Sequence, residues 1–398
     1  MRDQMEGERA IAHLLRRTVV APDAALWAAS RGASYDDVVE GLLTQLDAKR
    51  PPDPAGFDPY LPGAIQQLWL ERMVAGSTPF ADRVAFFWHD HFATSDAKIQ
   101  DPLLMWRQQR LLRDGGGGSW RELLRGVARD VAMIRWLDGN SNRRGHANEN
   151  FGRELQELFV LGIGRYSEDD VREVARAFTG WGSRHHEFVM RPEFHDDGDK
   201  TVHGRTGPFD GDDVIDILLE QPAAAEHLAR RLLRWFVTLD PRPEDVSSLA
   251  DVVRREDFHL RPVLGYLLRS EAFRDPSCEW ALVRSPVDQV VATWRVLGLR
   301  ALPGWVHASL DRMGQILFRP PSVKGWTQGT GWLSSGALVE RLALADRASE
   351  LALLDGLDAI ERLAYGPETP ASLVPALAEQ GGRDRARLLL GSPEFQRA

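Results

Sequence analysis

Helical periodicity is the feature that most restricts the fold of this chain. Through most of its 398 residues, apolar side chains recur every three or four positions, as in an amphipathic helix. Phe151, Leu155 and Leu158 illustrate the spacing, and capping residues such as Ser34 and Ser167 stand where periodic segments begin. We therefore predict a mainly α, multi-helical globular protein.

The helical pattern is interrupted between Gly180 and Gly211. Short β-like pieces at Glu187–Met190 and at residues 201–203 flank the polar run that starts at His195. We expect a small β-hairpin or a long loop insertion near residues 183–210, and long loops in compact domains are often functional. We divide the chain into an N-terminal helical region (1–110), a central motif-bearing core (111–335) and a C-terminal helical region (336–398), packed as one unit.

Composition excludes several classes of protein. The single cysteine, Cys278, leaves no disulfide framework and no cysteine-rich metal site. With a net charge of −9 and no block of basic residues, we expect no nucleic-acid partner. No apolar run approaches the roughly 18 residues of a membrane span, and the N-terminus lacks an apolar signal core, so we expect a cytoplasmic protein.

Four consecutive glycines at positions 115–118 form a second interruption. No Lys followed by Ser or Thr comes after them, so they do not match a phosphate-binding loop. We interpret the run as a flexible connector before a helix that Ser119 caps.

The segment that begins at Asn148 is the strongest candidate for chemistry. On a continuous helix, Asn150, Glu154 and Glu157 share one stripe beside the apolar face. Two carboxylates three residues apart can act as an acid/base pair or share a metal ion. The alternative is an ordinary surface helix, on which Glu149 and Arg153 form an i, i+4 ion pair.

Two histidines in an aromatic setting, His89 and His91, form the second candidate. Such residues serve as metal ligands or transfer protons. Because they are two residues apart, their rings point about 200° from each other on a helix. Both can bind one ion only if the helix ends or distorts there, and the alternative is that they are core or capping histidines.

Two loops complete the set of candidates. The run from His195 to Lys200 has three carboxylates, including Asp197, which can cage a hard cation, although the spacing is not that of an EF-hand. The alternative is a polar turn. The rigid loop from Arg319 to Trp326 can line a pocket for an anionic or sugar-like ligand, or serve as a structural lid.

These motifs occur together in a recognisable order: WHDHF, NENFGRELQELFVLGIG, HDDGDK and FRPPSVKGW. In this order the chain resembles, over nearly its whole length, a bacterial family called domain of unknown function 1800. The family has no agreed activity. Its members are frequently encoded beside sulfatase-like proteins, which implies a partner of that kind, and often carry export signals. Where the family often has His-Thr, this chain has Phe159-Val160; if that His is a ligand or an acid/base group in other members, this chain lacks it.

Our leading hypothesis is an enzyme, of the metal-dependent hydrolase type, whose pocket forms where these segments converge. Glu154 and Glu157 supply acid/base or ligand groups, and Arg153 and Lys200 hold an anionic substrate group. The catalytic candidates are Glu149, Arg153, Glu154, Glu157 and Lys200, and the candidate ligands of a divalent metal are His89, His91, His195 and Asp197. The rival hypothesis is a non-catalytic helical scaffold or partner-binding protein, in which the same motifs are polar networks that fix helix packing.

Overall fold

Helices form most of the structure, which confirms the mainly α prediction. The computed structural model describes residues 2–352 and 357–398. In the first half, the α-helices are α1 (Arg2–Val19), α2 (Ala24–Ser30), α3 (Tyr35–Thr44), α4 (Ala64–Ala75), α5 (Pro79–His91), α6 (Asp96–Ile99), α7 (Pro102–Gly115), α8 (Trp120–Arg129), α9 (Val131–Trp136), α10 (Glu149–Glu154) and α11 (Glu168–Ala177). In the second half they are α12 (Gly211–Leu219), α13 (Pro222–Phe236), α14 (Pro243–Arg255), α15 (Leu260–Arg269), α16 (Glu271–Arg274), α17 (Pro286–Val296), α18 (Trp305–Arg312), α19 (Ser335–Leu351), α20 (Leu357–Tyr365), α21 (Val374–Ala378) and α22 (Gly382–Gly391).

Shorter elements connect these helices. They are the 3₁₀ turns η1 (Gln45–Asp47), η2 (Gly139–Ser141), η4 (Pro192–Phe194), η5 (Pro276–Cys278) and η6 (Gly329–Trp332), the π-helix η3 (Leu155–Val160), and the strands β1 (Trp181–Arg184), β2 (Glu187–Met190), β3 (Lys200–Val202) and β4 (Arg205–Gly207).

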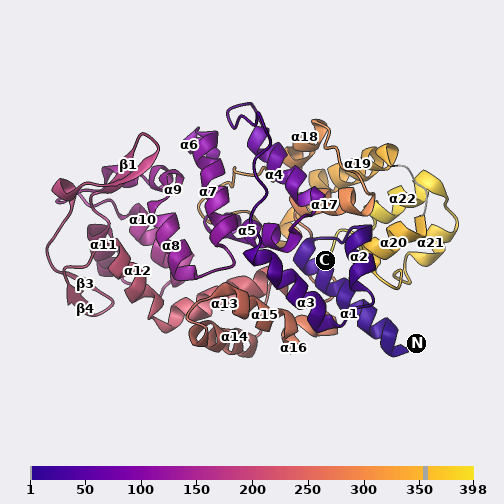
Figure 1. The fold of residues 1–398 in the computed structure, drawn as a ribbon, viewed down its shortest axis with the longest axis horizontal. Helices are drawn as coiled ribbons and strands as arrows, with labels where there is room; N and C mark the ends of the chain where they lie inside the picture. The colour runs from indigo at the N-terminus through magenta and orange to yellow at the C-terminus, as the bar shows by residue number, and fades with distance from the viewer. Residues whose placement is uncertain (1, 353–356) are drawn as a thin grey trace.

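The helices pack into an elongated body, with the strands at one end, α19 to α22 at the other, and α5 between them (Figure 1). One continuous hydrophobic core runs from Ile11 in α1 to Phe395 beyond α22. The division at residues 110/111 and 335/336 stays a prediction. Among the described residues, no helix combines the length and apolar character that crossing a membrane requires.

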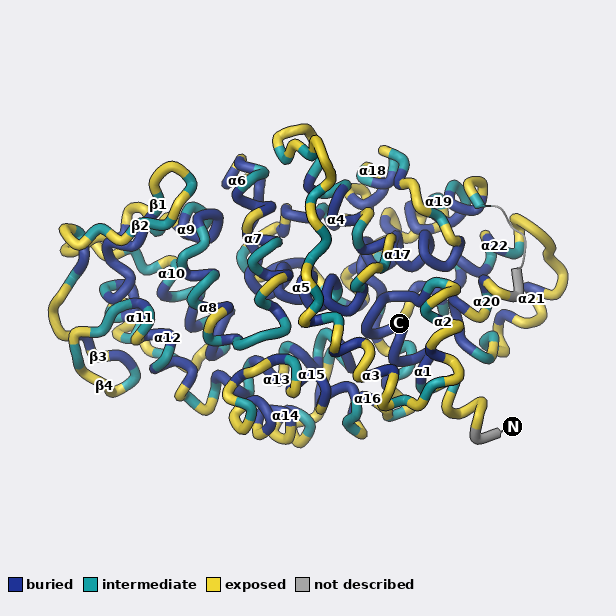
Figure 2. Tube along the Cα trace, viewed as in Figure 1, coloured by how far each residue is buried: buried dark blue, intermediate teal, exposed yellow. Residues whose placement is uncertain are grey.

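Two helices, α5 and α17, form the centre of the core. They are buried along almost their whole length, whereas α14 on the outer edge buries one face and exposes the other (Figure 2). Trp88 of α5 and Trp294 of α17 have no exposed surface. Helices that are apolar on all sides belong inside a large protein, so α5 carries its histidines into the interior.

Local capping chemistry agrees with the sequence. The Ser167 hydroxyl accepts from the amide of Asp170, whose carboxylate accepts from the amide of Ser167, a complete capping box. The Ser34 hydroxyl likewise accepts from the amide of Asp37 at the start of α3.

The insertion contains two antiparallel hairpins rather than one hairpin or a long loop. In β1–β2 the last pair is Arg184 with Glu187, and in β3–β4 it is Val202 with Arg205. Each hairpin turns through two residues with positive φ, His185-His186 and His203-Gly204. That backbone matches the twist of paired strands, but histidine is a weak sequence signal for such a turn.

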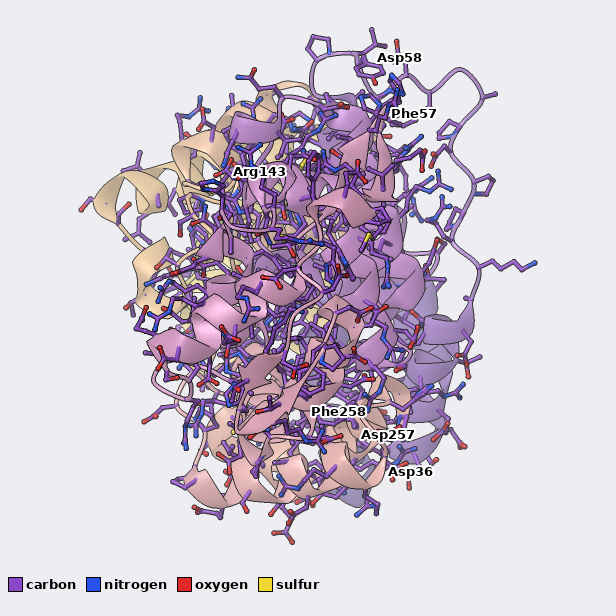
Figure 3. All side chains as sticks on the ribbon, turned by 90° about the vertical axis from the view of Figure 1, so that its left-hand side faces the viewer. Asp36, Phe57, Asp58, Arg143, Asp257 and Phe258 are labelled. Carbon is purple, nitrogen blue, oxygen red and sulfur yellow. The ribbon has the colours of Figure 1, made fainter. Side chains whose placement is uncertain are left out.

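The glycine run is a packed turn rather than a flexible connector. The carbonyl of Gly116 accepts from the indole of Trp88 at 2.9 Å, and a Cβ on Gly116 would lie 2.6 Å from that ring. The chain from Gly117 to Trp120 bonds to the segment that contains Phe258, whose carbonyl is 3.0 Å from the amide of Trp120. Figure 3, a view along the long axis, shows Asp257 and Phe258 in the lower part of the molecule and Phe57 and Asp58 at its top. The glycines allow close approach to the core.

Candidate functional site

The helix that begins at Asn148 changes its geometry at Leu155. Helix α10 continues as the π-helix η3, in which the amide of Leu161 donates to the carbonyl of Gln156, five residues earlier, at 2.9 Å. The side-chain amide of Gln156 donates to the carbonyl of Gly152 at 3.1 Å and so supports the distorted turn. The continuous helix assumed from the sequence is therefore wrong beyond Glu154.

Two histidines complete the hydrogen bonding at the end of the π-helix. Nε2 of His91 lies 2.9 Å from the carbonyl oxygen of Phe159, and Nε2 of His227 lies 2.9 Å from that of Leu158. Because a carbonyl oxygen only accepts, each Nε2 carries the proton and each Nδ1 keeps a lone pair. The two ring centroids are 6.0 Å apart.

Both imidazoles are neutral at pH 7. Burial, together with the charge of Arg231, holds the pKa of His91 well below its ordinary value, and burial lowers the pKa of His227 to about 4. Nδ1 of His91 is buried and bonds to no described residue. The site thus presents hydrogen-bond acceptors and not imidazolium cations.

A cavity of about 340 Å³ lies against these histidines. Its walls come from η3 and the turn after it, from α13, and from the loop around Lys324. Four cationic side chains line it, Arg165, Arg230, Arg231 and Lys324, against two carboxylates, Glu157 and Glu226. In a chain with a net charge of −9, this excess of positive charge is local and favours an anionic ligand.

The carboxylates of the segment differ in their surroundings. Glu157 lines the cavity, and its carboxylate accepts from the hydroxyl of Tyr166 at 2.5 Å. Glu154 is half-buried beside it and outside the cavity lining. Burial raises the pKa of Glu154; the charge of Glu157 adds to the rise, and Lys324 opposes it. Of the two glutamates, only Glu157 is placed to contact a ligand in the cavity.

The loop from Arg319 to Trp326 crosses the end of α5. One oxygen of Asp90 accepts from the amide of Trp326 at 3.0 Å, and the other faces Arg231 at 3.3 Å. Gly325 has a φ of +81° and a Cβ there would lie 2.5 Å from Asp90 Oδ1, so only glycine fits. The pocket-lining role expected of this loop agrees with the position of Lys324 in the cavity wall.

Arg153 and Glu149 lie outside the cavity. Arg153 bonds to Glu149 at 3.1 Å and to Glu168 at 2.7 Å, near the surface. Two carboxylates thus already neutralise Arg153, and the arrangement is the i, i+4 ion pair of the alternative interpretation, extended to α11.

In the run from His195 to Lys200, the oxygen atoms bond to cationic side chains of the protein itself. Nζ of Lys200, which is fully buried, donates to the carbonyls of Asp196 and Gly198 at 2.5 and 2.9 Å. Asp197 pairs with Arg144 at 2.7 Å, and Nδ1 of His195 lies 2.8 Å from the carbonyl of Thr179. Asp196 likewise pairs with Arg176 at 2.9 Å, so two of the three carboxylates expected to cage a hard cation are bound to arginines.

The two histidines of α5 face different surroundings, as their spacing predicts. His89 contacts Trp69, Phe318 and Trp326, and its Nε2 accepts from the amide of Phe318 at 3.1 Å. Burial lowers the pKa of His89 to about 3. Within residues 2–352 and 357–398, no three His, Cys, Asp or Glu side chains are grouped so as to hold a metal ion. His89, His91 and His195 each bond to a different backbone segment, and the structure does not bring them together.

Three residues of α13 that line the cavity were not predicted from the sequence: His227, Arg230 and Arg231. They are spaced at i, i+3 and i+4, which places them on one side of a helix whose other side is buried. A search for polar stripes on amphipathic helices would have selected them. Phe159, where the family often has His, is fully buried next to His91, with ring centroids 6.1 Å apart.

Comparison with known proteins adds a family and no activity. No curated protein matches the chain, and no solved structure does. The family model described as "Protein of unknown function (DUF1800)" matches residues 13–397, nearly the whole chain. The chain therefore belongs to the DUF1800 family of proteins of unknown function.

Proposed function

We propose that the protein is an enzyme that hydrolyses a small anionic ester in the cavity between η3 and α13. The observation that carries the proposal is the combination of a carboxylate, Glu157, with the unbalanced positive charge of Arg230 and Lys324 around one cavity. Cations bind the anionic group and stabilise negative charge that develops during the reaction. A carboxylate at the same cavity can transfer a proton.

In this reaction Glu157 takes a proton from a water molecule that attacks the ester. It returns the proton to the leaving alcohol oxygen, so that ester and water become acid and alcohol and the enzyme is unchanged. Nδ1 of His227 accepts a hydrogen bond from substrate or water, because its Nε2 is committed to the carbonyl of Leu158. The described residues support an acid/base mechanism more directly than a metal centre, since the expected metal ligands lie apart. A divalent metal stays a prediction from the sequence alone.

Hydrolysis of a panel of p-nitrophenyl esters (phosphate, sulfate and acetate) tests the proposal. We expect the charged esters to react, and Glu157→Gln, which keeps the bond to Tyr166, to lower kcat by about 10²–10⁴. Arg230→Gln should raise KM for the charged esters. The control, Glu187→Gln, removes an exposed carboxylate of β2 and should have no effect. Hydrolysis of none of the charged esters, or a Glu157→Gln variant with the wild-type rate, would refute the proposal.

A second candidate function is partner binding by a non-catalytic scaffold. It is supported by the internal bonds of Arg153 and Lys200, which act as structural links. On α19, Val339 and Leu342 are also 68% and 56% exposed, as at a protein interface. A sulfatase-like partner, expected from the family resemblance, belongs to this candidate. Glu157→Gln, which keeps the bond to Tyr166, separates the two: an enzyme should lose activity at unchanged thermal stability, whereas a scaffold should bind its partner like wild type.

A further inference from the structure

A second, smaller cavity lies on the other side of the last turn of α5. It has a volume of about 60 Å³ and is bounded by α1, α5, α13, the segment before α17, and the loop that includes η6. A buried water molecule requires roughly 10–15 Å³ measured in this way, so the cavity can hold a few waters or one small polyatomic ion. It shares no lining residue with the larger cavity.

Arginines dominate the wall of this small cavity. Arg17, Arg83, Arg234 and Arg284 line it, against two side-chain carboxylates, Asp90 and Asp288, and Ala398, the last residue of the sequence, lines it as well. Both carboxylates already have cationic partners: Asp288 bonds to Arg83 at 2.6 Å, and Asp90 faces Arg231, which belongs to the other cavity, at 3.3 Å. The wall therefore has more positive charge than its own acids neutralise.

Two of these arginines are buried without a carboxylate partner. Arg17 and Arg284 are each 1% exposed. Their hydrogen bonds go to neutral carbonyl oxygens: Arg17 donates to Val237 at 3.1 Å, and Arg284 donates to Phe395 at 2.7 Å. Nε and Nη1 of Arg17, and Nε of Arg284, bond to no described residue. Buried charges are normally paired, so these groups call for an anion that no side chain in residues 2–352 and 357–398 supplies.

The pKa values of Arg17 and Arg284 agree with the need for a bound anion. Burial, with a smaller contribution from Arg83 and Arg284, lowers the pKa of Arg17 to about 9. Burial lowers the pKa of Arg284 to about 10. Both side chains are still cations at pH 7, although burial disfavours their charge. A bound anion would relieve that cost.

We propose that this cavity binds a free inorganic oxyanion, phosphate or sulfate, through Arg17, Arg83 and Arg284. A tetrahedral oxyanion offers acceptors in several directions, which suits guanidinium groups that reach it from different helices. Trp235, Trp326 and Trp332 complete the wall and limit the access of water, which strengthens charge interactions inside it. The site is separate from the proposed hydrolytic cavity, and either can exist without the other.

Thermal denaturation of the whole protein in sodium phosphate, sodium sulfate or sodium chloride, at equal ionic strength, tests the site. At a phosphate concentration about 100 times Kd, we expect Tm to rise by about 3 °C relative to chloride. Isothermal titration calorimetry with phosphate should detect this site in the Arg230→Gln variant as well, in which binding to the larger cavity is weakened. Equal Tm values in all three salts, with no heat of binding, would overturn the proposal.

An isosteric variant makes the test specific to this cavity. The side-chain oxygen of Gln328 accepts from Arg234 at 3.4 Å in the wall, so Gln328→Glu places a carboxylate there without a change of shape. We expect this variant to be more stable than wild type without phosphate and to bind phosphate at least tenfold more weakly. Gln380→Glu, at an exposed position after α21, adds the same charge elsewhere and should bind like wild type. Equal affinity of the two variants would contradict binding in the cavity.

Discussion

Replacement of His89 by glutamine should make the stability of the protein less sensitive to acid. The imidazole of His89 is 1% exposed and packed among aromatic rings, and its Nε2 accepts from the amide of Phe318. In His89→Gln the side-chain oxygen can accept the same bond, while the group that titrates is lost. The variant thus separates the protonation of residue 89 from its hydrogen bond.

The size of the effect follows from the two pKa values of His89. Burial holds the pKa at about 3 in the folded state, against about 6.5 in the unfolded chain. Below pH 6.5 the unfolded state binds a proton that the folded state does not, so stability falls as the pH falls. Between pH 7 and pH 5 this histidine alone costs about 1.9 kcal/mol of unfolding free energy. The glutamine variant does not lose this part of its unfolding free energy.

Urea denaturation at pH 7, 6 and 5 measures the effect. At pH 7 we expect His89→Gln to be less stable than wild type by about 1–2 kcal/mol, because packing is lost. That difference should shrink by about 1.9 kcal/mol at pH 5, so that the variant equals or exceeds wild type. His146→Gln, at an exposed position, is the control and should leave the pH dependence unchanged. A stability difference that is the same at pH 7 and pH 5 would refute the reasoning.

Three further predictions concern packing and hydrogen bonding. Gly116→Ala should lose about 1–3 kcal/mol in thermal denaturation, since its Cβ has no room, whereas at Gly118→Ala the nearest atom is 3.4 Å away and the loss should be small; equal losses would contradict the packed turn. Asp82→Ala leaves the buried charge of Arg113 unpaired and should cost about 3–5 kcal/mol in urea denaturation, more than Asp82→Asn. Gln156→Met removes the bonds of its side chain to the Gly152 carbonyl and to His203 and should cost about 1–3 kcal/mol, with faster hydrogen exchange at the amides of η3; unchanged exchange there would count against a role of Gln156 in the π-helix.

The features that the sequence predicts well are those that depend on neighbouring residues. The capping box joins Ser167 and Asp170, which are three positions apart, and the divergence of His89 and His91 follows from helix geometry alone. The overall helical character can also be predicted, because the spacing of apolar residues in each amphipathic segment indicates which face of the helix is buried.

The features that could not be predicted from the sequence depend on contacts between residues that are far apart in the sequence. The end of the π-helix is satisfied by His91 and His227, 68 and 69 residues from the carbonyls that they cap. Asp196 and Asp197 pair with Arg176 and Arg144, which lie 20 and 53 residues away in the sequence, so the acids alone resembled an open cation site. Arg230 of α13 could not be predicted as a site residue, because it becomes one only through the cavity that η3 forms beside α13.

The position of α5 between two cavities has a thermodynamic consequence. Asp90 lines the small cavity and its neighbour His91 lines the large one, while Arg231 of the large cavity faces Asp90 at 3.3 Å. A ligand that draws Arg231 toward itself in one cavity leaves Asp90 free to bind an arginine of the other. Occupancy of the two cavities is then linked, and the linkage is reciprocal: each ligand changes the affinity of the other by the same factor.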